Sequence, residues 1–206
     1  MDEKALYKIS YGLFVLSARE GDKDNGCIIN TVSQVTAIPN RISITIEKSN
    51  YTHDMIMRTR KFNVSVLSES ASFAIFERFG FQSGRNVDKF AGFMNVERSE
   101  NGLLYLTEGT NAYLSGKVEE ILDLDTHTLF IASLEDMQIL NEVPSTTYAY
   151  YHANIKPKQE KVAVLEPGKT VWRCTICGYE YVGEELPEDY ICPICKHPAS
   201  DFEKVS

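Results

Sequence analysis

Short runs of alternating apolar and polar residues dominate the first three quarters of the chain. Ile42–Glu47 and Phe62–Leu67 alternate with the period of two that a half-buried strand requires. Apolar runs at Tyr11–Ser17 and Cys27–Thr36 predict two further strands, and the polar cluster Gly21–Gly26 predicts the turn between them. These segments together predict an antiparallel meander.

The remaining pattern adds more strands and a few helices. Strands are expected at Leu103–Leu106, Ala112–Leu124, Thr126–Leu134 and Ala149–His152. Helices are expected near residue 3, from the N-cap residue Asn50 to about Arg60, and over Ser70–Phe79, whereas residues 81–100 lack a clear period. Many strands with few helices predict a mainly β fold, a closed or nearly closed barrel.

A polar segment divides the chain. Lys156–Lys161 and the pair Pro167–Gly168 have linker composition. We therefore expect a barrel domain at residues 1–155, a linker at residues 156–167 and a small domain at residues 168–206.

Charge and composition restrict the partners. The net charge is −8, and no block of lysines or arginines suits a nucleic-acid backbone. The N-terminus lacks a basic leader, and the apolar stretch Leu13–Leu16 is too short to cross a membrane. Five cysteines, an odd number, favour free thiols over a disulfide framework. We expect a cytoplasmic protein that binds neither nucleic acid nor membrane.

Four of the cysteines form a metal-binding pattern. Two C-x-x-C pairs, separated by fourteen residues, supply the ligands Cys174, Cys177, Cys192 and Cys195. Two residues between the cysteines of a pair let both thiolates reach one ion, with backbone N–H groups directed at the sulfurs. Four thiolates suit iron or zinc, and the ligand count leaves that choice open.

The residues around these cysteines indicate iron. Trp172, Tyr179, Tyr181 and Phe202 can form an aromatic core over the ion, and Gly178 permits a positive φ. Residues 168–206 resemble a rubredoxin of the short-loop form, which implies one iron that carries one electron at a time. The alternative is a structural zinc ribbon.

The barrel segment lacks the common nucleotide and hydrolase motifs. It contains no P-loop, no G-x-G-x-x-G after a strand, no nucleophile elbow and no H-E-x-x-H. Instead, Asn25–Pro39 and Lys48–His53 resemble the flavin reductase-like proteins with an FMN-binding split barrel. The resemblance implies FMN contacts at Asn30, Thr31, Val32, Ser33 and Gln34, with Lys48, Asn50, Tyr51 and Thr52 nearby.

Other interpretations of these residues remain open. Thr31, Ser33 and Thr36 can be outward residues of an ordinary strand. By the same resemblance His152 lies near the flavin or its hydride donor and is the candidate catalytic residue, or it is a plain strand-end histidine. Cys27 is expected to be a small core residue.

The whole chain resembles the high-molecular-weight rubredoxins. The resemblance implies an oxidoreductase in which NADH, or NADPH, reduces FMN, and electrons pass through the iron to a flavodiiron protein that reduces oxygen or nitric oxide. It also implies a homodimer. The alternatives are a passive carrier reduced by a separate reductase and a zinc-stabilised binding module.

Overall fold

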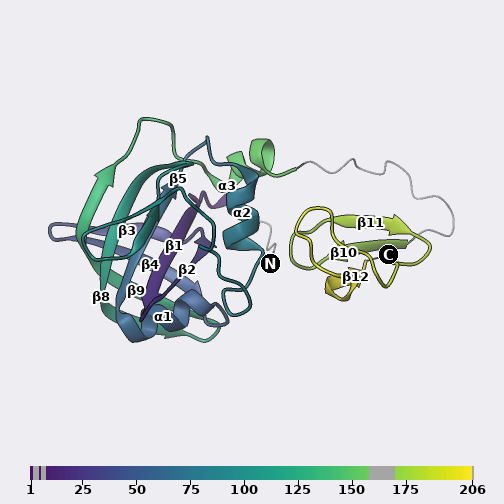
Figure 1. Cartoon of the computed structure of the whole chain (residues 1–206), viewed down its shortest axis with the longest axis horizontal. Helices are drawn as coiled ribbons and strands as arrows, with labels where there is room; N and C mark the ends of the chain where they lie inside the picture. The colour runs from purple at the N-terminus through teal and green to yellow at the C-terminus, as the bar shows by residue number, and fades with distance from the viewer. Residues whose placement is uncertain (2–4, 6–7, 158–169, 206) are drawn as a thin grey trace. The chain divides into compact units, whose positions relative to one another are not determined.

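The computed structural model describes residues 1, 5, 8–157 and 170–205 of the chain. It forms two compact units, Met1–Ile155 and Lys156–Ser206, coloured purple to green and green to yellow in Figure 1. Among the described residues, no helix is long and apolar enough to cross a membrane. The helix expected near residue 3 and most of the expected linker lie outside the described residues.

A curved antiparallel sheet organises the first unit (Figure 1). Its seven strands run in the order β2-β1-β5-β8-β9-β4-β3, so β2 and β3 are its edges. The strands are β1 Phe14–Glu20, β2 Lys23–Ile29, β3 Val32–Ala37, β4 Asn40–Glu47, β5 Lys61–Leu67, β8 Thr110–Leu124 and β9 His127–Ile139. The expected mainly β, barrel-like fold is confirmed.

One apolar cluster fills the inside of this sheet. Alternate residues of β4, Ile42, Ile44 and Ile46, are at most 3% exposed, as the period-two pattern predicts. Helix α1 (Tyr51–Thr59) adds Met55 and Ile56 to the same cluster. The helix thereby buries its apolar side in the barrel, and its first turn lies beside Asn25 of β2 and the end of β4.

A second cluster forms where helix α2 (Phe73–Gly80) meets the sheet. Phe76 and Phe79 of α2 are buried, and Leu106 of β7 (Leu104–Leu106) joins them. β7 pairs with β6 (Val96–Arg98) as a separate two-stranded sheet. The strand expected at Leu103–Leu106 is thus confirmed as β7, whereas β6 lies within residues 81–100, which lack a clear period.

Two strand predictions need correction. The Gly21–Gly26 turn is shorter than expected, because Asp24, Asn25 and Gly26 pair with β1 and only Gly21 and Asp22 separate the strands. The segment Cys27–Thr36 is not one strand, because β2 ends at Ile29 and β3 begins at Val32. The chain changes direction there from one edge of the sheet to the other.

The strand predicted at Ala149–His152 is wrong. These residues lie in α3 (Tyr148–Tyr150) and a π-helical turn, η2 (Tyr151–Ile155). Thr147 caps the segment, its hydroxyl accepting from the N–H of Tyr150 at 3.1 Å. Tyr151 then packs on the ring of Phe76 with centroids 4.4 Å apart. Capping and this long-range contact outweigh the strand preference of the aromatic residues.

The second unit is a three-stranded sheet with two cysteine turns. Its order is β11-β10-β12, formed by β10 Thr170–Cys174, β11 Glu180–Gly183 and β12 Phe202–Lys204, with a 3₁₀ turn, η3, at Ala199–Asp201. The first cysteine pair starts in the last residue of β10, and the second follows the long loop after β11.

Candidate functional site

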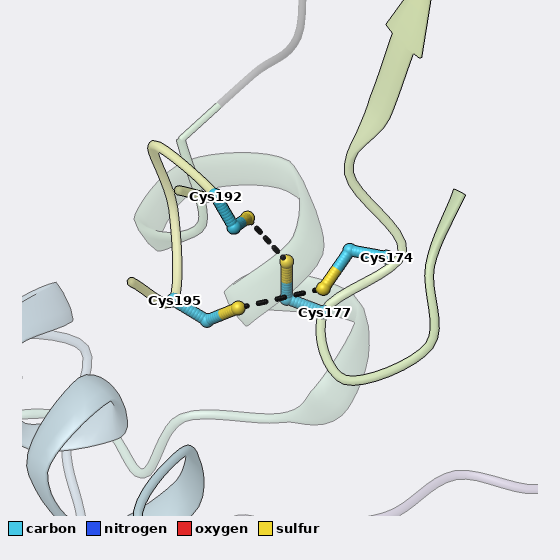
Figure 2. Close-up of side chains that lie close together, drawn as sticks. All are labelled: Cys174, Cys177, Cys192 and Cys195. Atoms are coloured by element: carbon cyan, nitrogen blue, oxygen red, sulfur yellow. Dashed lines mark hydrogen bonds between the residues drawn. The ribbon is translucent and has the colours of Figure 1, made fainter. Parts of the chain in front are cut away.

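Four cysteine sulfurs converge in the second unit. Sγ of Cys174 lies 3.5 Å from Sγ of Cys195, and Sγ of Cys177 lies 3.5 Å from Sγ of Cys192 (Figure 2). All four sulfurs lie within 4.8 Å of one another, and each residue is at most 6% exposed. The structure thus brings together all four ligands that the spacing predicted.

Each C-x-x-C pair closes on a residue with positive φ. Gly178 after the first pair has a φ of 74°, as expected, and Lys196 after the second has a φ of 62°. The N–H of Gly178 donates to the carbonyl of Cys174 at 2.8 Å, and that of Lys196 donates to the carbonyl of Cys192 at 3.0 Å. The two turns therefore have matching geometry, and each directs two sulfurs to one point.

Backbone N–H groups prepare the sulfurs for negative charge. The N–H of Tyr179 donates to the thiol of Cys177, and that of His197 donates to Cys195. Burial nevertheless raises the pKa of Cys177 to about 11 and raises the pKa of Cys195. At Cys192 burial acts in the same direction, but N–H groups of Cys195 and Ile194 outweigh it and lower the pKa. Four buried thiolates require a bound cation.

The donor set fits a tetrahedral ion. Metal–sulfur bonds of about 2.3 Å at tetrahedral angles place the sulfurs roughly 3.8 Å apart. The observed separations of 3.5 to 4.8 Å bracket that value. Iron or zinc can therefore enter with only small side-chain movements.

Aromatic rings pack together beside this centre. Tyr190 is at the middle of the group, with its ring centroid 4.6 Å from Tyr181 and 5.5 Å from Phe202. Its hydroxyl donates to that of Tyr179 at 3.2 Å. Tyr190 was missed as a core residue because it precedes the second cysteine pair by only two positions and has no periodic partner in the sequence.

The segment predicted to contact the flavin runs along an open edge of the barrel. Among the described residues β3 pairs with β4 alone, and the N–H of Thr45 donates to the carbonyl of Thr31 at 3.3 Å. Alternation along an antiparallel ladder then turns the peptide groups of Val32 and Gln34 away from β4. These outward N–H and carbonyl groups can bind a planar heterocycle edge-on.

The side chains of this segment have local partners. The hydroxyl of Thr31 donates to the carbonyl of Thr45 at 2.5 Å, and Ser33 and Gln34 contact carbonyls of Gln34 and Thr36. Val32 packs against the first cluster. Asn30 lies between the two strands, where the chain leaves β2. Main-chain groups are therefore the main binding groups that this edge offers.

The second predicted segment surrounds the start of α1. Asn50 is the N-cap, accepting from the N–H of Thr52 at 2.9 Å, and the Lys48 ammonium pairs with Asp123 at 2.7 Å. Thr52 is fully buried, and its hydroxyl accepts from the amide of Asn25 at 2.9 Å. Thr31, at the start of the first segment, bonds to Thr45 of β4, the strand that leads into the second segment.

Two cations that the sequence did not single out lie at Tyr51, the first residue of α1. The Lys23 ammonium is 4.5 Å and the Arg85 guanidinium 5.2 Å from its ring centroid. Arg85 also donates to Asp54 at 2.7 Å. Burial opposes ionisation of Asp54, but Arg85 and then His53 outweigh it and lower the pKa of that carboxyl. No local motif could have identified residues so far apart in the sequence.

Three other residues considered in the sequence have defined places. Cys27 is 2% exposed in the first cluster, which agrees with its expected core role, and burial raises the pKa of its thiol. His53 bonds to Thr128 through Nε2 at 2.9 Å. His152 stands on η2 with its ring edge-on to Tyr148, centroids 4.6 Å apart. The His152 ring also lies edge-on to Tyr151 of the second cluster, with centroids 5.2 Å apart.

Comparison with known proteins relates both units to redox families. The model of the flavin reductase-like domain matches residues 6–159, and that of the rubrerythrin, rubredoxin-like domain matches residues 172–203. The high molecular weight rubredoxin of Moorella thermoacetica is 36% identical over the full length of both chains. The chain belongs to the flavin reductase-like family. In addition to the barrel, the chain carries the rubredoxin-like domain at residues 172–203.

Further matches concern the barrel of this flavin reductase-like protein. The NAD(P)H ferric-chelate reductase of Archaeoglobus fulgidus is 34% identical over 80% of this chain and 97% of its own. The FMN-binding protein of Thermus thermophilus is 22% identical, with a TM-score of 0.59 over 65% of this chain and 73% of its own. The latter shows a shared fold. The expected fusion of a flavin reductase-like barrel to a rubredoxin-like domain is confirmed.

Both groups that these families imply fit the residues present. The four sulfurs form the donor set of a rubredoxin-like iron. For the flavin, the open edge of β3 offers main-chain groups, and the corner at α1 offers cations. The chain is thus an oxidoreductase with a flavin site and a one-metal site.

Proposed function

We propose that this chain is an NAD(P)H-dependent electron-transfer oxidoreductase of the high-molecular-weight rubredoxin type. It takes hydride from a nicotinamide nucleotide on FMN and delivers single electrons through the cysteine-bound iron. The acceptor we propose is a flavodiiron protein that reduces oxygen or nitric oxide. The observation that carries the proposal is the set of four buried, converging thiols in the same chain as a flavin reductase-like barrel.

The chain's own groups bind and orient the two centres. FMN, when bound, supplies the exchange between hydride and single electrons, and iron supplies a one-electron carrier. The outward peptide groups of Val32 and Gln34 would hold the ring edge, and Asn30, Thr31 and Ser33 would line the rest of that contact. Asn50, Tyr51 and Thr52 would surround the phosphate end beside the helix N-terminus, with Lys48, which pairs with Asp123, nearby.

Hydride transfer requires no acid or base from the protein, so positioning and exclusion of water are the barrel's contribution. Because the barrel sequence carries no dinucleotide-binding turn, the nicotinamide is expected to lie directly against the flavin. We propose that His152, exposed on η2, contacts the flavin or its donor in the assembled protein.

We also propose that the chain is a cytoplasmic homodimer, and its exposed surface and its cysteines support this. Edge strand β3 carries Val35 at 49% exposure, and Ile38 follows it at 96%, a surface that suits a homodimer. All five cysteines are free thiols, which suits the reducing cytoplasm. We propose the domains 1–155 and 168–206 with a linker at 156–167 between them.

The test begins with the visible spectrum and the flavin, iron and zinc content of the purified full chain. NADH or NADPH is then added without oxygen. The expected result is about one FMN and one iron per chain, with rapid bleaching of both centres. Rapid turnover of a flavodiiron protein on adding the reduced chain then identifies the acceptor.

A matched variant separates the two centres. Cys195→Ser is expected to lose the iron bands but retain flavin bleaching by the nucleotide. Flavin that bleaches only when a separate reductase is added contradicts the proposal and makes the chain a passive carrier. Zinc in place of iron, with no flavin, indicates a structural binding module instead.

A further inference from the structure

Two cations from distant parts of the chain meet at one aromatic ring. Lys23 begins β2, Arg85 follows α2 by several residues, and Tyr51 begins α1. The Lys23 ammonium and the Arg85 guanidinium lie 4.5 and 5.2 Å from the Tyr51 ring centroid. Two like charges beside one ring repel each other, so an arrangement that holds them together suits an anionic ligand.

The loop that carries Arg85 is fixed in place by contacts with β2. The carbonyl of Gly84 accepts from the Lys23 ammonium at 3.1 Å. A Cβ on Gly84 would come 2.0 Å from the amide oxygen of Asn25, which is buried at 1% exposure. Only glycine allows this approach. The backbone beside Arg85 is therefore held against β2 although it belongs to neither helix nor strand.

The surroundings of Lys23, Tyr51 and Arg85 have a net positive charge. Asp54 accepts from one guanidinium nitrogen of Arg85 at 2.7 Å and also contacts His53 at 3.2 Å. In the part of the chain that the structure describes, Asp54 is the acidic partner of Arg85, so the other guanidinium N–H groups can donate to a ligand. Asp24, next to Lys23, pairs instead with Arg19 and Arg98. The first-turn N–H groups of the nine-residue helix α1 add to the positive potential.

Lys48 differs from these two cations. Its ammonium is held by both oxygens of the Asp123 carboxylate, at 2.7 and 2.8 Å. A phosphate would have to displace that carboxylate to bind Lys48. At Lys23, the contacts that the structure shows are a carbonyl and an aromatic ring, both compatible with a further anionic partner.

We propose that Lys23, Tyr51 and Arg85 bind a phosphomonoester dianion, which determines which flavin or nicotinamide nucleotide the barrel prefers. Two sources share this chemistry, the 5′-phosphate of FMN and the 2′-phosphate of NADPH. The inference deepens the proposed function and depends on it. It assigns phosphate recognition to residues that no short motif connects.

The test compares ligand pairs that differ only in the phosphate. The full chain is loaded with FMN or with riboflavin, and stepwise dilution with detection of released flavin fluorescence gives both Kd values. Steady-state kinetics with NADPH and NADH give the ratio of their kcat/KM values. These measurements are repeated for Lys23→Gln and Arg85→Gln, with Lys61→Gln as a control that removes an exposed cation at the start of β5.

If the site binds the flavin phosphate, each variant weakens FMN about tenfold while the Kd of riboflavin is unchanged, since a charge-assisted hydrogen bond is lost. If the site binds the 2′-phosphate, the ratio of kcat/KM for NADPH to kcat/KM for NADH falls by a similar factor instead. Arg85→Lys, which keeps the charge, should lose less than Arg85→Gln in either case. The unchanged riboflavin Kd also shows that the variants remain folded.

Failure of this inference differs from failure of the proposed function. The phosphate site is wrong, while flavin reduction stands, if Lys23→Gln and Arg85→Gln leave two quantities at their wild-type values: the ratio of the FMN and riboflavin Kd values, and the ratio of kcat/KM for NADPH and NADH. The same holds if Lys61→Gln shifts a ratio as much as they do. A wild-type chain that retains neither FMN nor riboflavin overturns the proposed function, and the phosphate site with it.

Discussion

At the scale of single residues, two buried tyrosines show how burial and charge act together. Tyr105 and Tyr113 stack with ring centroids 4.1 Å apart, and each is 6% exposed. Tyr105 donates to Glu97 at 2.8 Å and Tyr113 to Asp136 at 2.7 Å. The pKa of each tyrosine is raised to about 12. The main cause is burial at Tyr105 and the hydrogen bond to Asp136 at Tyr113.

The raised pKa values predict a loss of stability at alkaline pH. The unfolded pKa of tyrosine is about 10, and a tyrosine with a higher pKa in the folded protein stabilises the fold. Its full contribution is present below about pH 10 and is lost as the pH rises towards 12. The urea unfolding free energy should therefore fall between about pH 10 and 12, and less steeply in Tyr113→Phe. Tyr150→Phe serves as the control, and an unchanged slope in Tyr113→Phe contradicts this account.

At the scale of elements, a local cap stabilises the helical turn of α3 and η2, where the sequence predicts a strand. Thr147 accepts from the N–H of Tyr150, and its own carbonyl accepts from the N–H of Tyr151 at 2.9 Å. The N–H of Tyr148 donates to the carbonyl of Tyr11, also at 2.9 Å. The segment thus has its backbone groups satisfied in a helical turn while Tyr151 enters the second cluster.

Removing the cap should cost about 1 kcal/mol of unfolding free energy. Thr147→Ala leaves the N–H of Tyr150 without the hydroxyl, whereas Thr147→Ser retains it. Urea unfolding followed by circular dichroism should give a lower midpoint for the alanine variant and a nearly unchanged one for the serine variant. Equal losses in both variants would assign the effect to the methyl group of threonine rather than to capping.

At the scale of the whole molecule, the two units differ in what stabilises them. The first has two apolar clusters within 155 residues, whereas the second has 51 residues and a three-stranded sheet around four thiols. A domain that small rarely buries enough apolar surface to fold without a disulfide or metal. The metal is therefore expected to contribute much of the folding free energy of the second unit.

Loss of the metal should unfold the second unit and leave the barrel folded. Cys177→Ser and Cys195→Ser are each expected to expose residues 170–205 to protease. Calorimetry should still show the barrel transition at its wild-type temperature, with the smaller transition absent. A barrel transition that shifts with the metal would contradict independent folding of the two units.

The sequence by itself determined the features that depend on neighbouring residues. The C-x-x-C spacing places two sulfurs on one turn, Gly178 supplies the positive φ, and the alternation of Ile42, Ile44 and Ile46 assigns one face of a strand to the core. Each of these follows from backbone geometry over a few residues, so a pattern in the chain is enough.

Only the tertiary structure decided the features that join distant residues. The meeting of Lys23 and Arg85 at Tyr51 depends on Gly84 packing against Asn25, and the helical turn at residues 148–155 depends on Phe76 receiving Tyr151. The break between β2 and β3 likewise depends on which strands each one pairs with. Long-range packing and pairing outweigh local preference at these places, because their energies depend on segments that the local sequence does not contain.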